Sequence, residues 1–327
     1  SVRFNTFGNV YVQYQIADGL TFKSSIRGNF NTSKGKAYFT EKFGWGKIVG
    51  GRAYINTSQG SGITTEQNLN FNKTYGKHRL GATAVYEQQQ TSFESVRSGG
   101  TGFDIPNVNL DNLGSAKETI INNTTFAPRA LKSYLGRIQY DFDNRFVLNL
   151  SARYDGASIF AEDYKWGFFP SAGLAWKVSN EKFLKNNKII SNLKLKTSYG
   201  ETGNQAIAPF RPLPQTDSNN AIFNGNELGV GLSVGNIIAP GLTWETTTQV
   251  DAGISLGLFN NRISIEADYY NKETTDLLLE QPIPATSGFD VVFTNVGSLV
   301  NKGYEFAVNT TNIESENFTW SSSFNIS

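Results

Sequence analysis

The sequence predicts an all-β, antiparallel transmembrane β-barrel, and three observations lead to this fold class. Apolar and polar residues alternate with a period of two along most of the chain, which is typical of strands whose two faces meet different surroundings. Most predicted strands reach the roughly 9–11 residues needed to cross a bilayer, whereas strands of soluble proteins usually run about 5–6. The connections between strands are alternately short and long, as on the two rims of an outer-membrane barrel.

The alternation predicts twelve strands. In one of them Phe146, Leu148 and Leu150 share a face, while Asn149 and Ser151 lie on the other face. No long helix competes, although residues 180–184 could form one helical turn. The predicted strands are 2–16, 20–31, 64–75, 78–94, 131–142, 145–154, 168–178, 191–201, 244–258, 262–275, 297–311 and 318–327.

The connections explain why a barrel is favoured over a soluble β-sandwich. Short turns built from residues that tolerate positive φ follow odd-numbered strands, at Asp18-Gly19, Gly76-Lys77, Asp143-Asn144 and Asn260-Asn261. The segments 179–190 and 312–317 belong to the same rim. Longer excursions follow the even-numbered strands, near 32–63, 95–130, 155–167, 202–243 and 276–296. A sandwich with one buried face is the alternative, but it explains neither the strand length nor this sorting by parity.

Composition restricts the function classes. Charged residues make up 17%, below the roughly 25% of ordinary globular domains, and the net charge of +1 gives no general electrostatic case for nucleic acid. The chain has no cysteine, which excludes disulfides and thiolate metal sites. It also has no methionine and begins within a strand pattern, so we expect a partial barrel domain over residues 1–327. Because a bilayer tolerates no open sheet edge, twelve strands must close on themselves or form an arc of a larger barrel.

Catalytic chemistry is not predicted. The single histidine, His78, lies at a tight turn, so a histidine-based triad or zinc site would need another chain. The Asp141–Arg145 stretch lacks the later glycine and glutamate of a calcium loop, and the Gly200–Asn204 stretch lacks the lysine of a phosphate loop. We therefore predict no enzyme activity, no metal and no cofactor.

Binding residues are instead expected on the long loops, because loops on a rigid scaffold commonly carry function. Acidic and aromatic side chains suit sugars or a protein partner, while a solvated or shielding loop is the plainer alternative. The candidates are Asp155, Glu162, Asp163, Tyr164 and Trp166 in one loop and Phe210, Arg211, Asn219, Asn220 and Phe223 in another.

A series of short motifs then suggests a family. The most specific are Arg153-Tyr154-Asp155-Gly156, Trp166-Gly167-Phe168-Phe169-Pro170-Ser171, Gly200-Glu201-Thr202-Gly203-Asn204-Gln205, Leu242-Thr243-Trp244-Glu245, Asp268-Tyr269-Tyr270-Asn271-Lys272, Asn295-Val296-Gly297-Ser298 and Asn301-Lys302-Gly303-Tyr304-Glu305. In this order they closely resemble the SusC/RagA-type TonB-linked (TonB-dependent) outer-membrane transporters of Bacteroidetes. The resemblance covers about 60–327 well and the first sixty residues loosely.

The resemblance implies a 22-stranded barrel in the outer membrane, with a lumen filled by an N-terminal plug. The plug, the first strands and the closing strands would lie outside this chain. It implies active import of oligosaccharides or peptides, with TonB and a SusD-like surface lipoprotein as partners. A passive porin or structural barrel is the alternative, and an outer-membrane hydrolase is a weaker one. The identity of the substrate does not follow from the sequence.

Overall fold

The computed structural model describes residues 1–103, 110–185, 187–223 and 227–327, without the side chains of 120–123, 219–223, 227–228 and 230. These residues divide into two compact units. The first unit comprises 1–12, 24–66 and 87–131, and the second comprises 13–23, 67–86 and 132–327. Most of the structure relevant to function belongs to the second unit.

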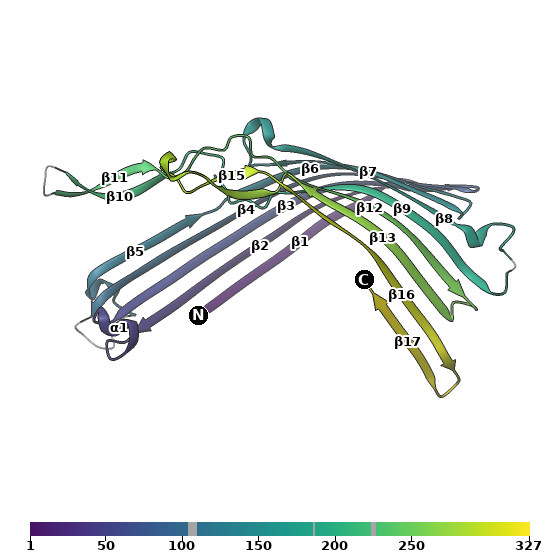
Figure 1. Cartoon of the computed structure of the whole chain (residues 1–327), viewed down its shortest axis with the longest axis horizontal. Coiled ribbons are helices and arrows are strands. Elements are labelled where there is room, and N and C mark those ends of the chain that lie inside the picture. The colour runs from purple at the N-terminus through teal and green to yellow at the C-terminus, as the bar shows by residue number, and fades with distance from the viewer. Residues whose placement is uncertain (104–109, 186, 224–226) are drawn as a thin grey trace. The chain divides into compact units, whose positions relative to one another are not determined.

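The chain is built around one 13-stranded sheet in which the twelve predicted strands follow one another in sequence order (Figure 1). Two of these strands, β1 and β17, stand at the ends of that order, and the described part of the sheet is not closed. The twelve strands are β1 (Val2–Ala17), β2 (Leu20–Phe39), β3 (Arg52–Tyr75), β4 (His78–Phe103), β6 (Arg129–Phe142), β7 (Phe146–Ala157), β8 (Trp166–Lys177), β9 (Ile190–Asn204), β12 (Glu245–Leu258), β13 (Ile263–Thr275), β16 (Ser298–Glu314) and β17 (Thr319–Ile326).

The predicted long excursions contain more regular structure than expected. Strand β5 (Ala116–Phe126) pairs with the end of β4, and two separate hairpins are formed by β10 (Thr216–Phe223) with β11 (Glu227–Val234) and by β14 (Leu278–Pro282) with β15 (Val291–Asn295). The predicted helical turn near 180–184 is a 3-10 helix, η3 (Val178–Asn180), followed by one hydrogen-bonded turn. No helix in the described ranges is both long and apolar enough to cross a membrane.

Within the first unit, the connection from β2 to β3 contains the short helix α1 (Gly44–Ile48), which the alternation did not predict. Gly46 is buried there. Only glycine fits this position, because a Cβ would lie 2.3 Å from the Thr40 carbonyl oxygen. The neighbouring backbone is fixed by hydrogen bonds from the amides of Gly102 and Phe103 to Gly51 and Gly50. The connection is therefore a folded loop and not an extended excursion.

The predicted tight turns are confirmed by their backbone geometry. Positive φ occurs at Gly19, Gly76, Asp143 and Asn144, and at the three consecutive residues 259–261. Glycine and asparagine adopt this conformation at small cost, which explains the composition of these turns.

The two faces of the sheet differ chemically, as the alternation predicts. In the second unit, Leu256 pairs with Ile265 on one face, while the adjacent Ser255 pairs with Glu266 on the other. We call the face carrying Leu148, Ile254 and their cross-strand neighbours the apolar face, and the opposite face the polar face. The polar face holds a recess of about 640 Å³ lined by Asn149, Lys196, Ser198, Asp251, Asp268, Tyr270, Lys272, Asn301 and Glu305, among others.

Glycine allows one ion pair to cross the polar face. Lys196, Gly253 and Asp268 are direct neighbours on β9, β12 and β13. The Lys196 Nζ and Asp268 Oδ1 atoms lie 2.8 Å apart, above Gly253. A Cβ on Gly253 would come within 1.8 Å of that carboxylate oxygen, so the pair requires glycine beneath it.

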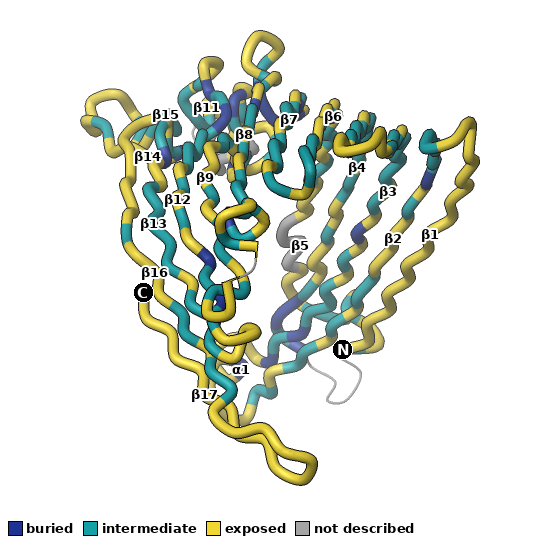
Figure 2. Tube along the Cα trace, turned by 90° about the vertical axis from the view of Figure 1, so that its right-hand side faces the viewer, coloured by how far each residue is buried: buried dark blue, intermediate teal, exposed yellow. Residues whose placement is uncertain are grey.

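Buried residues are few along the strands, most of whose length is exposed or intermediate (Figure 2). Of the eleven buried apolar residues in the described ranges, eight lie where the long connections of this unit meet. This concentration indicates where to look for a site.

Candidate functional site

The candidate site is the long-loop rim of the second unit, made of the described residues 158–165, 205–223, 227–244 and 276–297. These three connections follow β7, β9 and β13. The first two contact each other through a small core of aromatic side chains, and the third is joined to the second by hydrogen bonds.

Trp244 is the centre of this core. Its Nε1 donates a hydrogen bond to the Lys165 carbonyl oxygen at 2.9 Å. Its ring lies 5.4 Å from that of Phe160 and 5.5 Å from that of Phe169, centre to centre. All three aromatic side chains are at least 93% buried. Trp244 therefore joins the connection after β9 to the one after β7.

Two glycines make room for this packing. A Cβ on Gly203 would lie 2.0 Å from the Phe169 ring, and one on Gly167 would lie 2.5 Å from the same ring. This explains the Gly200–Asn204 motif, in which Gly203 leaves room for the buried ring of Phe169. The sequence contained both the glycine and the ring, but only the fold shows that they meet.

A second tie joins the connections after β9 and β13. The Asn295 carboxamide accepts a hydrogen bond from the Thr243 amide and donates to the carbonyls of Thr243 and Asp276, all at 2.9 Å. Glu245 adds hydrogen bonds from Asn204 and from the Leu278 amide. The Asn295-Val296-Gly297 and Thr243-Trp244-Glu245 motifs are thus two halves of one clamp.

The candidates in the first loop separate into three groups, which are Asp155, residues 162–164 and Trp166. Asp155 is 93% buried and accepts hydrogen bonds from Arg153 Nε at 2.8 and 2.7 Å, so it positions the Arg153 guanidinium. Glu162, Asp163 and Tyr164 form the 3-10 helix η2 (Glu162–Tyr164), where Glu162 pairs with Lys165. Only this second group is an exposed loop of the predicted kind.

Trp166 belongs to a row of aromatic rings. It stacks on Tyr154 with ring centres 4.7 Å apart and lies 6.3 Å from Tyr134, which in turn lies 5.2 Å from Tyr86. Tyr154 shares the apolar face with Leu148 and Leu150, since alternate residues of a strand point the same way. Such a row is typical of the aromatic girdle of a membrane barrel.

The candidates in the second loop lie near the β14–β15 hairpin. Arg211 forms an ion pair with Glu280, and its guanidinium lies 4.6 Å from the centre of the Phe293 ring. Phe210, next to it, has a φ of 65°. These contacts border a recess of about 320 Å³ that is also lined by Asp217, Asn236, Phe289 and Asp290. Asn219, Asn220 and Phe223 lie on β10, but their side chains are outside the described residues.

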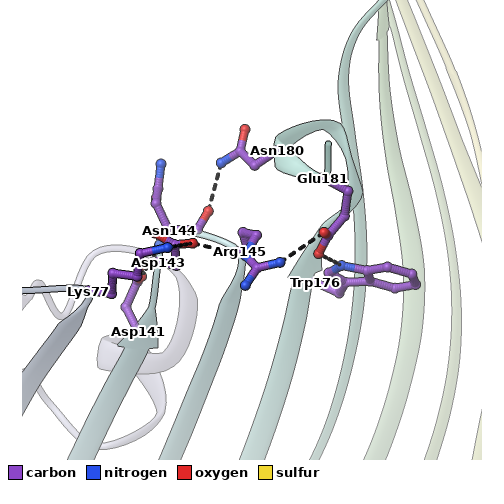
Figure 3. Close-up of polar contacts among 8 residues, drawn as sticks. All are labelled: Lys77, Asp141, Asp143, Asn144, Arg145, Trp176, Asn180 and Glu181. Carbon is purple, nitrogen blue, oxygen red and sulfur yellow. Dashed lines mark hydrogen bonds and ion pairs between the residues drawn. The ribbon is translucent and has the colours of Figure 1, made fainter. Parts of the chain in front are cut away.

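The short-turn rim of the second unit carries a charged network that the sequence did not indicate (Figure 3). Lys77 Nζ lies 3.1 Å from Asp143 Oδ2, and Arg145 lies 3.3 Å from the same oxygen. Arg145 also donates to Glu181 at 2.9 Å, and Glu181 accepts a hydrogen bond from the indole of Trp176 at 3.0 Å. The network links the ends of β4, β6, β7 and β8.

Both acids of this network are held ionised. The hydrogen bond from Lys77 lowers the pKa of Asp143, with smaller contributions from the charges of Arg145 and Lys185. The Trp176 hydrogen bond lowers the pKa of Glu181, and Arg145 adds to the effect. Each carboxylate accepts hydrogen bonds that favour its ionised form.

These observations define the chain as part of a membrane β-barrel wall, with a folded rim of long loops. Residues 2–327 match the family model "TonB dependent receptor-like, beta-barrel". The chain belongs to this family, whose members are outer-membrane proteins, and its sheet is a portion of the family's barrel.

Relatives and solved structures agree with this assignment. The chain is 35% identical over 320 residues to TonB-dependent receptor P3 of Formosa agariphila, covering 98% of the chain and 32% of that protein. It is 38% identical over 208 residues to TonB-dependent receptor SusC of Bacteroides thetaiotaomicron, covering 62% and 21% respectively. It superposes on a chain of the RagAB peptide transporter with a TM-score of 0.90 and 25% identity, covering 99% of this chain and 36% of that one.

The SusC/RagA resemblance and the barrel fold class are therefore confirmed. The chain spans about a third of the length of P3 and of the RagAB chain. These relatives are receptors and transporters.

Proposed function

We propose that the protein to which this chain belongs imports oligosaccharides or peptides across the outer membrane by TonB-coupled active transport. In this proposal it is not an enzyme, and a SusD-like surface lipoprotein docks on the long-loop rim. The remaining two thirds of the protein would supply the plug and the TonB contact. The name of the RagAB peptide transporter supports peptides as substrates, and oligosaccharides are what the SusC/RagA-type resemblance implies.

The observation that carries the proposal is the preformed long-loop rim. Trp244 joins the connections after β7 and β9, and Asn295 joins those after β9 and β13, so the rim presents a defined surface and not three independent loops. Preorganised loops bind partners with a smaller loss of conformational entropy. The only histidine, His78, lies at the other end of the strands and is hydrogen-bonded to Tyr140, which gives no support to a hydrolase.

The β10–β11 hairpin is the best candidate for the partner-binding part. It forms a two-stranded sheet of its own, and such hairpins are only marginally stable alone. Leu232 and Val234 share one face of β11 and are 75% and 64% exposed. Exposed apolar side chains beside polar ones are typical of protein interaction sites.

The test is removal of this hairpin from the full-length protein. Thr216 and Val234 are cross-strand partners, so residues 217–233 can be replaced by a two-residue Asn-Gly turn. The main sheet loses no strand, and we expect normal surface expression with loss of lipoprotein pull-down and of growth on the native substrate.

A milder variant separates contact from folding. The double substitution Leu232→Ser and Val234→Ser keeps the hairpin backbone, and Ser233→Ala between them is the matched control. The double variant should weaken lipoprotein capture and the control should not. Wild-type capture and uptake after removal of the whole hairpin would contradict the proposed partner role.

A further inference from the structure

One connection at the short-turn rim is far longer than its neighbours. Strands β6 and β7 are joined by a tight turn at 143–145, whereas β8 and β9 are separated by residues 178–189. This segment is folded: the amides of Leu184 and Lys185 both donate to the Glu181 carbonyl, and the Asn187 side chain accepts from the amides of Ile189 and Ile190. We call the described residues of this stretch, 181–185 and 187–189, the rim segment.

The rim segment is held beside the apolar face of the sheet. Glu181 is the attachment point, because it bonds both Arg145 and the Trp176 indole (Figure 3). Trp176 is the cross-strand partner of Phe146, and their rings stack 5.9 Å apart. Alternation places both on the face that carries Leu148 and Leu174. The segment thus begins where the apolar face meets the rim.

The side chains that the segment displays are apolar and basic. Phe183 is 72% exposed and Ile189 is 54% exposed. Lys182, Lys185 and Lys188 are exposed as well, and none of them forms an ion pair with another residue in the described ranges. The other lysines of this rim differ, since Lys77 and Lys177 pair with Asp143 and Asp141. The only carboxylate of the segment, Glu181, is already occupied by Arg145.

We propose that the rim segment is a binding surface for anionic phospholipid headgroups of the membrane leaflet at the short-turn rim. The ammonium groups of Lys182, Lys185 and Lys188 are opposite in charge to phosphate, and each lysine near an anionic membrane surface contributes favourably to binding. In this proposal the exposed Phe183 and Ile189 enter the boundary between headgroups and acyl chains, next to which the Phe146–Trp176 stack ends the apolar face. The pinned backbone presents both sets of side chains at once.

An acidic periplasmic protein is the competing occupant. It would explain the lysines, but it leaves the exposed apolar side chains of Phe183 and Ile189 without a role. Continuity with the apolar face therefore favours lipid.

The test uses the full-length transporter in detergent, titrated with phosphatidylglycerol and, in parallel, with phosphatidylcholine. Bound lipid is counted by native mass spectrometry. The variant K182Q/K185Q/K188Q removes three charges, and K182R/K185R/K188R is the matched control that keeps them. All six substitutions are on exposed side chains, and folding is verified by the heat-dependent shift of the barrel on gels.

Wild type and the arginine variant should bind phosphatidylglycerol in preference to phosphatidylcholine. The glutamine variant should lose about 100-fold in affinity for phosphatidylglycerol, from about 5-fold per lysine. Equal phosphatidylglycerol binding by wild type and the glutamine variant would overturn the proposal. The same holds if the glutamine variant keeps its lipid but no longer captures a periplasmic protein that wild type captures.

Discussion

Substituting arginine at Leu150 tests the assignment of the two faces and gives a magnitude that can be derived from the structure. Leu150 lies on the apolar face of β7, between two aromatic pairs on the same face, Phe146 with Trp176 and Tyr154 with Trp166. At about 3.3 Å per residue and a tilt of about 40°, Phe146 and Tyr154 are about 20 Å apart across the membrane.

Leu150 is four residues from each of these girdle positions, so it lies near the middle of the bilayer. Arginine at this depth on a lipid-facing barrel position costs about 2–4 kcal/mol. The neighbouring Asn149 points to the polar face, near Arg137 and Lys196. Arginine at Asn149 adds only repulsion between hydrated charges, for which we expect less than about 1 kcal/mol.

The assay is urea-induced unfolding of the full-length protein in phospholipid vesicles, followed by the gel shift of the folded barrel. Leu150→Arg should lower the free energy of unfolding clearly more than Asn149→Arg. Equal losses, or a larger loss for Asn149→Arg, would refute the assignment of faces and with it the membrane orientation of β7.

Two further predictions concern the rims. Gly203→Ala places a Cβ 2.0 Å from the ring of Phe169, which is packed against its neighbours, so the free energy of unfolding should fall by about 1–3 kcal/mol. Gly200→Ala is the control and should be tolerated, because the atom nearest to its Cβ is 3.4 Å away. Equal stability of the two variants would contradict the packing. At the other rim, the pKa of Glu181 is lowered, so its ionised carboxylate stabilises the fold at pH values above its ordinary pKa of 4.5. This contribution is lost as the pH falls through the lowered pKa. Glu181→Gln should therefore show a smaller loss of stability than wild type when urea midpoints at pH 7 and pH 3 are compared, and parallel losses would argue against the network.

The main strands were predictable because a barrel wall imposes a simple rule on its sequence. Each strand has one face in lipid and one in a polar lumen, so the period of two persists over the whole strand, as in β12 and β13. The turns were equally predictable, since Asp143 and Asn144 need positive φ. The hairpins β10–β11 and β14–β15 were not predicted, because β10, β14 and β15 do not alternate and the alternation of β11 spans only eight residues inside a long connection.

The long-loop rim was predictable in location but not in construction. Trp244 was visible as part of a motif, and Gly203 as part of another, yet their shared contact with Phe169 forms only when the connection after β9 folds back onto β8. For Asp155 the sequence predicted a role that the fold does not support. Its acidic side chain suggested an exposed binding group, but β7 directs it inward, where Arg153 neutralises it.

The distribution of buried residues gives the rim its functional meaning. A barrel wall one sheet thick has no core of its own, because lipid takes the place of a core on one side and the lumen lies on the other. Burying Phe160, Phe169, Leu242 and Trp244 at the long-loop end is therefore not needed for strand pairing in the wall, although it adds packing stability at that end. The burial fixes the shape of the loops. Fixed loops are useful only to something that binds them, since a loop that merely shields the lumen works equally well when it moves. The aromatic core thus favours a docking rim over a passive shield.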